Sequence, residues 1–263
     1  MADKKSPGLW IETGVDGKFC VVMSGAYGPE KHLPLITPAE DLVAAAEMDY
    51  TAYRREIQRL YDGHPLFAER LDVPESDLED LTAEALLLPS TLREIDPLSF
   101  FVLGSLLDQA LRMQDDGSPI FLLRAGQRLL QVLELPIRTQ IRLRNIMEMT
   151  FDGTERATQQ ERFAKLHNAY PEIAAFCDPA HLDGYGDTPL QLCVGSVFQL
   201  RLIELLLYFR QEKQRIARCD YCWNYFIPRT QAATRYCDRI FDGQSCKKRG
   251  AKKKKKKGPE QDD

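Results

Sequence analysis

Four of the seven cysteines of this 263-residue chain fall within 28 consecutive residues near its carboxyl end. Cys219 and Cys222 are separated by two residues, a spacing that lets a tight turn bind one metal ion while its amides point at the sulfurs. Cys237 and Cys246 are separated by eight residues, so the chain between them must fold back, with its turn at Asp242-Gly243. The pattern predicts a four-thiolate Zn²⁺ site, structural rather than catalytic because no coordination position stays open for water.

Disulfide bonds and redox chemistry are the two alternatives to zinc for these cysteines. A disulfide framework would imply export, yet residues 1–8 are polar and lack the charged and apolar parts of a signal segment. A redox CxxC pair would be expected beside a βαβ pattern, and none is visible. No apolar run reaches membrane-spanning length. The sequence therefore favours zinc over disulfides or redox chemistry, in a cytoplasmic protein without a membrane segment.

The residues around the cysteines predict a small module over 218–251. Aromatic and β-branched runs at 223–228 and 234–236 flank a polar stretch and indicate a short hairpin. The basic run that follows Cys246 could begin a short helix. Knuckle, hairpin and basic turn in this order are typical of a treble-clef-like or ribbon-like zinc module.

The same segment resembles the C-terminal motif of an uncharacterised bacterial family, a domain of unknown function. Its members carry CxxC, an aromatic-Phe-Ile-Pro step, Tyr-Cys-Asp-Arg, and a final Cys followed by Gly-Ala. The matching residues here are Cys219, Cys222, Tyr225-Phe226-Ile227-Pro228, Tyr236-Cys237-Asp238-Arg239, Cys246 and Gly250-Ala251. The segment is more distantly similar to the CGNR-type zinc fingers of bacterial transcription regulators, although no Cys-Gly-Asn-Arg string occurs. The resemblance implies zinc binding in a bacterial protein and no established activity.

The rest of the chain predicts a mainly α protein: a small N-terminal β-hairpin within 1–36 and a multi-helix domain over 37–217. Residues 9–12 and 19–23 form the two strands of the hairpin, and 25–35 is expected to be a loop. Thr37-Pro38-Ala39-Glu40 is a capping box with proline at the first helical position, so a helix starts there. It runs, with a break near Asp49, to Asp62-Gly63.

Later helices are predicted from apolar residues that recur at helical spacing. Short helices are expected between 65 and 92, and longer ones begin at Asp96-Pro97, Ser118-Pro119 and Pro136. Another covers 154–176, and a last long one is capped by Thr188-Pro189-Leu190-Gln191. That last helix is apolar nearly all round, which predicts burial. It continues into Cys219, so the zinc module should be attached without a flexible linker.

Charge is distributed unevenly along the chain. Between 210 and 257 there are 16 basic and 4 acidic residues, a net +12, whereas the whole chain carries −4 and the remainder therefore −16. A basic end on an acidic body predicts an anionic partner, and we expect nucleic acid, with DNA favoured. The Lys-rich tail 252–263 is expected to be disordered. The residues expected to meet phosphates are Arg229, Arg235, Arg239, Lys247, Lys248 and Arg249.

The sequence leaves several alternatives open. One is a tail that is only solubilising, and another is a module for protein–protein contact with a purely structural zinc. Tyr225, Phe226 and Tyr236 are expected to pack the hairpin rather than stack on bases. The arginines at 138, 142 and 144 are expected to form a solvated face.

An enzymatic role is not favoured by the sequence. No familiar catalytic string occurs, and the loop 177–187, with one Cys, one His and three Asp, fits no known ligand or nucleophile spacing. No catalytic residue is predicted. An unrecognised site in the helical domain is the third alternative.

Overall fold

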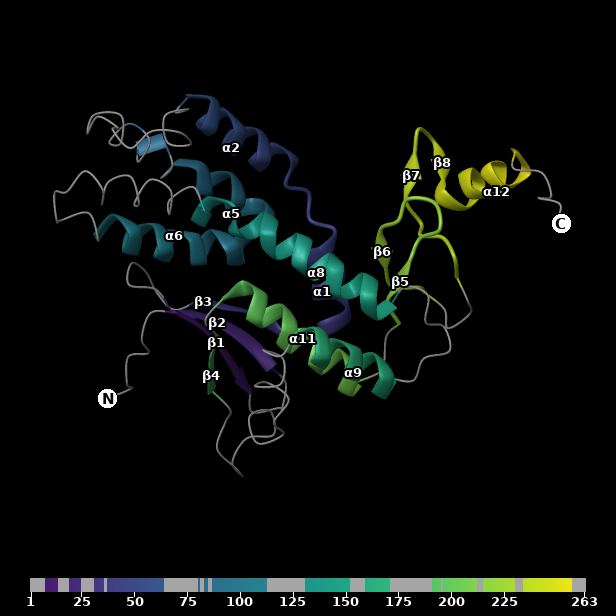
Figure 1. Cartoon of the computed structure of the whole chain (residues 1–263), viewed down its shortest axis with the longest axis horizontal. Coiled ribbons are helices and arrows are strands. Elements are labelled where there is room, and N and C mark those ends of the chain that lie inside the picture. The colour runs from purple at the N-terminus through teal and green to yellow at the C-terminus, as the bar shows by residue number, and fades with distance from the viewer. Residues whose placement is uncertain are drawn as a thin grey trace. The chain divides into compact units, whose positions relative to one another are not determined.

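The structure, a computed structural model, describes residues 8–13, 19–24, 31–35, 37–63, 80, 83–84, 87–112, 131–151, 159–170, 191–194, 196–211, 215–229 and 234–256. The described part is mostly helical, as predicted, with a small sheet near the amino end and short strands around the cysteines (Figure 1). The chain divides into two compact units. The first comprises Met1–Ile36, Met48–Arg142 and Asp183–Leu200, and the second comprises Thr37–Glu47, Leu143–Leu182 and Arg201–Asp263.

The first unit contains a four-stranded antiparallel sheet in the order β3-β2-β1-β4. Strands β1 (Gly8–Thr13) and β2 (Phe19–Ser24) pair from Gly8↔Ser24 to Thr13↔Phe19, which confirms the predicted N-terminal hairpin. Ile11, Val21 and Val22 of these strands are buried. The hairpin thus supplies apolar side chains to the core of this unit.

Two strands of this sheet were not predicted. Residues 25–35 were expected to be a loop, but Lys31–Leu35 forms β3 and pairs with β2. The expected helix cap at 188–191 is also wrong at Gln191, because Gln191–Val194 forms β4 along the other edge of the hairpin, on β1. Strands β3 and β4 form hydrogen bonds with backbone N–H and C=O groups that the hairpin alone would leave unpaired. This pairing between strands outweighs the local sequence signals for a loop at 25–35 and a helix cap at 188–191.

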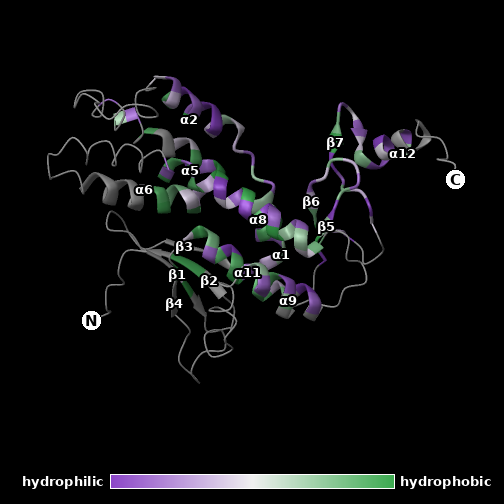
Figure 2. Ribbon diagram, viewed as in Figure 1, coloured by the Kyte–Doolittle hydropathy of each residue, from purple (hydrophilic) through white to green (hydrophobic). Residues whose placement is uncertain are grey.

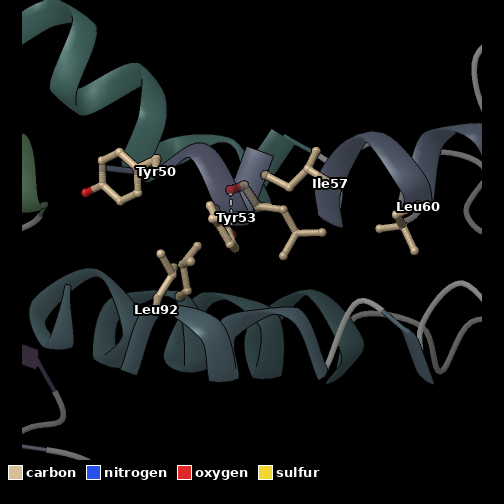
Figure 3. Packing of buried hydrophobic residues seen from close by; sticks show 7 residues of the cluster. Tyr50, Tyr53, Ile57, Leu60 and Leu92 are labelled. Atoms are coloured by element: carbon tan, nitrogen blue, oxygen red, sulfur yellow. Dashed lines mark hydrogen bonds between the residues drawn. The ribbon is translucent and has the colours of Figure 1, made fainter. Parts of the chain in front are cut away.

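The helical part of the first unit surrounds one apolar cluster (Figure 3). The helices of this part are α2 (Thr51–Gly63), the 3₁₀ helix η1 (Leu88–Thr91), α5 (Leu92–Ile95), α6 (Pro97–Arg112) and the beginning of α8 (Leu135–Phe151). The predicted helix starts at Pro97 and near Pro136 are confirmed. The predicted helix from Ser118 lies mainly outside the described residues. The buried members of the cluster are Tyr50, Tyr53, Ile57, Leu60, Leu92, Leu103 and Leu133.

Two tyrosine hydroxyls in this cluster have polar partners. Tyr53 donates to the carbonyl oxygen of Leu133 at 2.8 Å, and Tyr50 donates to Asp96 at 2.5 Å. Burial raises the pKa of Tyr53 far above its ordinary value. Buried hydroxyls with such partners avoid the desolvation penalty that an unpaired polar group would carry.

The second unit contains α1 (Pro38–Ala46), α9 (Gln159–Ala169), the later part of α8 and residues 201–211 of α11 (Val197–Gln211). The predicted start at Thr37-Pro38 is confirmed, but the expected capping-box bonds do not form. Instead, the Thr37 amide donates to Oδ2 of Asp41 at 2.9 Å. The break near Asp49 is confirmed, since α1 ends at Ala46 and α2 begins at Thr51.

Helix α11 is buried along most of its length, as predicted. It begins at Val197, and its cap is Ser196, whose Oγ accepts from the Gln199 amide at 3.2 Å. Glu204 is buried and Arg201 pairs with both of its carboxylate oxygens, at 2.8 and 2.7 Å. Burial raises the pKa of Glu204 although Arg201 opposes the shift. None of the described helices is long and apolar enough to cross a membrane.

Arg138 and Arg142 are exposed, as expected for a solvated face, Arg144 is half-buried, and all three also contact other side chains. Arg138 pairs with Glu134, and the guanidinium of Arg142 lies 3.7 Å from the Phe198 ring centroid. Arg144 donates to Glu47 at 3.2 Å. All three therefore have a structural role that can account for them.

Candidate metal centre

The four cysteines predicted from spacing meet at one point of the second unit. Their sulfurs all lie within 4.8 Å of one another, and Cys237 Sγ is 3.6 Å from the sulfurs of both Cys222 and Cys246. Zn–S bonds of about 2.3 Å at tetrahedral corners require S···S edges of about 3.8 Å. The thiols are free, and these separations are far from the roughly 2 Å of a disulfide bond. The cluster is thus shaped to hold a metal ion.

Each ligand is placed by a short element (Figure 1). Cys219 follows β5 (Ala217–Arg218), and the chain turns through Cys222 into β6 (Tyr225–Phe226), which pairs with β5. Cys237 precedes β7 (Ile240–Phe241), and β8 (Gln244–Ser245) leads into α12 (Cys246–Lys256). Knuckle, hairpin and helix follow in the predicted treble-clef-like order.

The hairpins differ in one respect from the prediction. Residues 223–228 were expected to pair with 234–236. Instead, β6 pairs with the preceding strand β5, and the Cys219–Cys222 knuckle lies in the connection between these two strands. The second hairpin has its turn at Asp242 and Gly243, as predicted, with φ values of 45° and 70°. Two consecutive positive φ angles are what a two-residue type I′ turn requires, and Asp-Gly supplies them at little cost.

Backbone hydrogen bonds contribute to the shape of the Cys219–Cys222 knuckle. The Trp223 amide donates to Cys219 O at 3.0 Å, and the Cys219 amide donates to Asn224 O at 2.9 Å. The Cys237 amide points at Cys219 Sγ, 3.5 Å away. Amides directed at a sulfur stabilise its thiolate form.

The thiols differ in how readily they ionise. Burial disfavours the thiolate of Cys219, but the backbone amides of Cys222, Cys237 and Tyr221 together lower its pKa to about 7. Burial raises the pKa of Cys237 to about 11 and that of Cys246 still further. Crowding four thiolates in a buried cluster is therefore unfavourable unless a cation lies between them.

Aromatic residues pack around the sulfurs. Tyr221, Phe226 and Tyr236 are partly buried against the cluster, and Tyr225 is 1% exposed, in agreement with the expectation that they pack the hairpin. Gly250 of α12 lies so close to the Tyr236 ring that a Cβ there would be 2.3 Å from a ring carbon. The helix can approach the ring only because residue 250 has no side chain.

Glu47 connects the module to the end of α1 within the second unit. Its side chain is 8% exposed, its Oε1 accepts from the Tyr225 amide at 2.8 Å, and Arg144 Nη1 lies 3.2 Å from the same oxygen. Arg239 Nη1 lies 3.6 Å from its other oxygen. An exposed pair between Arg218 and Glu148, 2.9 Å apart, adds a second connection. These bonds hold the module against α1 and α8 within the second unit, as expected of a module whose orientation the scaffold sets. Residues 212–214, where a linker would lie, are outside the described residues.

The six residues predicted to meet phosphates fall into three groups. Arg239 faces Glu47, and Arg249 donates to Phe241 O at 2.7 Å and to Asp242 at 2.6 Å, so both serve the module itself. Arg229 and Arg235 are largely exposed and pair with Asp238 and Asp220 at 3.0 and 3.1 Å. Lys247 and Lys248 are exposed on the first turn of α12.

Two residues of this region were not singled out from the sequence. Glu47 lies some 170 residues before the module, and nothing local to it signals that partner. Trp223 was assigned only to a hairpin strand, yet it is 57% exposed with a positive φ of 62°. Its position directly after the CxxC turn was the one available signal. The loop 177–187 lies outside the described residues.

The chain matches no protein-family model, no curated protein and no solved structure. The function must therefore be argued from the site alone.

Proposed function

We propose that the protein is a zinc-binding protein that binds nucleic acid through its four-cysteine module and the basic helix that follows. Zn²⁺ is the proposed ion because four thiolates at tetrahedral separations are its characteristic structural donor set. Membership of the bacterial family that the motif resembles, a regulatory role and a cytoplasmic location belong to the same proposal.

The observation that carries the proposal is the position of Cys246. It is at once a candidate ligand and the first residue of α12, whose next residues are Lys247 and Lys248. Helix α12 extends to Lys256, further than the predicted end of order at 251, and its ribbon in Figure 2 is largely hydrophilic. A bound ion would hold the start of a helix that carries a dense positive charge. Clustered lysines release counterions when they neutralise phosphates, which gives salt-dependent affinity.

The six residues predicted to contact phosphates differ in how available they are, because they differ in their partners within the module. Lys247 and Lys248 are the best placed to meet phosphates, followed by Arg229 and Arg235, whose exposed ion pairs cost little to exchange. Arg239 and Arg249 support the module's fold, so their replacement would act through stability.

The test is a titration of the zinc-loaded full chain with duplex and single-stranded DNA at two salt concentrations. We expect affinity to fall steeply with salt and the double variant Lys247→Gln/Lys248→Gln to reduce the salt slope by about 2, one for each lost phosphate contact. The matched control is Arg54→Gln/Arg55→Gln, which removes the same charge from the exposed face of α2. Binding that is absent, or insensitive to salt, would refute the proposal.

Protein–protein contact is the second candidate, and one observation favours it. Ile240 is 70% exposed and Phe241 38% exposed, and β7 appears in Figure 2 as a hydrophobic strand. Exposed apolar side chains of this kind are typical of protein contact sites. Replacing both with serine should leave DNA affinity unchanged and abolish any self-association seen by sedimentation.

A further inference from the structure

Trp223 is the most exposed aromatic residue in the part of the module that the structure describes, at 57% against 38% for Phe241. Tyr225 is buried, and Tyr221, Phe226 and Tyr236 pack against the cysteine cluster, whereas more than half of the Trp223 side chain is exposed. It lies directly after Cys222, so its position is tied to the candidate metal centre.

The backbone holds Trp223 in an unusual conformation. Its φ of 62° is in the left-handed region, which glycine adopts freely and bulky residues rarely do. Two hydrogen bonds fix it there: the Trp223 amide donates to Cys219 O at 3.0 Å, and Arg218 Nε donates to Trp223 O at 3.1 Å. Glycine would suit this backbone better, so the large side chain is not there for the sake of the turn.

The ring is also supported on one side by a cation. The guanidinium carbon of Arg218 lies 4.9 Å from the Trp223 ring centroid, and Arg218 is itself held by Glu148 at 2.9 Å. A side chain fixed before binding loses little freedom when a ligand arrives, which favours affinity. An exposed indole beside a guanidinium matches a nucleotide, whose base stacks and whose phosphate is negative.

We propose that Trp223 is a stacking platform for an unpaired base, which makes single-stranded nucleic acid the preferred partner of the module. This inference rests on the proposed function and deepens it. Bases in a duplex are stacked on each other and present no free face to an exposed ring, whereas unpaired bases do. More than half of Trp223 stays exposed beside Arg218, which leaves indole surface for a base to cover.

The chain offers a direct optical test because it has only two tryptophans. In the Trp10→Phe variant, Trp223 is the sole tryptophan and its fluorescence reports on its own surroundings. The zinc-loaded full chain is titrated with a thymidine strand of about 12 nucleotides, within the range of single-strand site sizes. A strand of abasic sites with the same number of phosphates is the matched probe.

We expect the thymidine strand to quench the fluorescence and the abasic strand to bind more weakly without quenching. Trp223→Gly, which suits the left-handed backbone, should weaken thymidine binding roughly 5- to 150-fold, as expected for one lost base–aromatic stack. Its salt slope and zinc content should not change, and Trp223→Phe should retain part of the affinity. Ile240 is another exposed apolar residue of the module, so the Ile240→Ser variant is the control and should bind the thymidine strand with unchanged affinity.

The possible failures are distinguishable. Equal binding of both strands without quenching, together with normal salt dependence, would overturn the stacking role and leave the proposed function intact. Absence of salt-dependent binding to any strand would refute both. If Trp223→Gly instead abolished self-association while DNA affinity stayed the same, the residue would belong to a protein contact and the inference would be wrong. Quenching in the Trp10→Phe parent needs no substitution at 223, so a folding defect cannot hide the result.

Discussion

The apolar cluster of the first unit and the four-cysteine module are stabilised by different means. The cluster buries seven large side chains, six from helices and Tyr50 from the segment before α2, so burial of apolar surface holds it together. The module has strands of two residues each and one helix, and its centre consists of thiols. A region with so little apolar surface to bury would need a bound ion to hold its shape, and it is also the region that displays charge and an exposed tryptophan.

The largest expected effect tests that dependence. Cys222→Ser should reduce metal content from about one zinc per chain to none and unfold the module, because structural zinc supplies about 10–16 kcal/mol of apparent folding free energy. Metal analysis and hydrogen exchange of residues 217–246 would measure this. Cys177→Ser, which alters a cysteine that is not one of the four predicted ligands, should retain the zinc. A metal-free wild-type protein with a cooperatively folded module would contradict the comparison.

The reciprocal change removes apolar packing from the first unit. Leu92→Ala should lower the free energy of unfolding of that unit by about 2–5 kcal/mol, through lost burial and the cavity that remains. Zinc content should stay the same. Leu87→Ala is the matched control, since Leu87 is 71% exposed and should contribute little. Loss of zinc in Leu92→Ala would show that the two regions do not hold their shapes independently.

A third substitution tests the contacts of Glu47 that attach the module to the rest of the second unit. Glu47→Ala leaves the Tyr225 amide and two arginines without their buried carboxylate, which should cost about 1–3 kcal/mol. Exchange of the Tyr225 amide should accelerate while zinc is retained. Glu94→Ala, an exposed glutamate of α5, should leave that amide unchanged. Unaltered protection at Tyr225 would mean that the attachment of the module does not depend on Glu47.

The smallest expected effect concerns pH. Burial raises the pKa of Glu204, and burial also raises that of Asp41. Between the unfolded-state glutamate pKa of about 4.3 and the raised value, the folded protein binds more protons than the unfolded chain. The free energy of unfolding should therefore fall as pH rises through that interval. Glu204→Gln should reduce this slope in urea unfolding measured at several pH values, and an unchanged slope would contradict the assignment.

Local patterns predicted the elements whose signals lie within a few residues. The Asp242-Gly243 turn, the break before Thr51 and the metal ligands all follow from neighbouring residue types. The sequence predicted a helix start at Thr188-Pro189-Leu190-Gln191, but Gln191 lies in β4 and α11 begins at Val197, where Ser196 accepts from the Gln199 amide. Local signals identify candidates, and the surrounding fold decides between them.

What the sequence could not predict depends on distant partners. Strand β4 forms because the edge of β1 lies beside it, and no residue near Gln191 encodes that edge. Glu47 becomes an anchor only when Tyr225 and Arg239 reach it. In the same way, Arg239 and Arg249 carry the charge expected of phosphate contacts, and only their folded neighbours show that they serve the module.

The double role of Cys246 links two equilibria. If this residue both ligates the ion and starts α12, any polyanion that prefers the ordered lysines must, by thermodynamic reciprocity, tighten the hold on the metal. Removing the ion should then require a higher chelator concentration at equilibrium when an oligonucleotide is present. Metal supply in the cell would in turn tune how much of the protein is competent to engage its target.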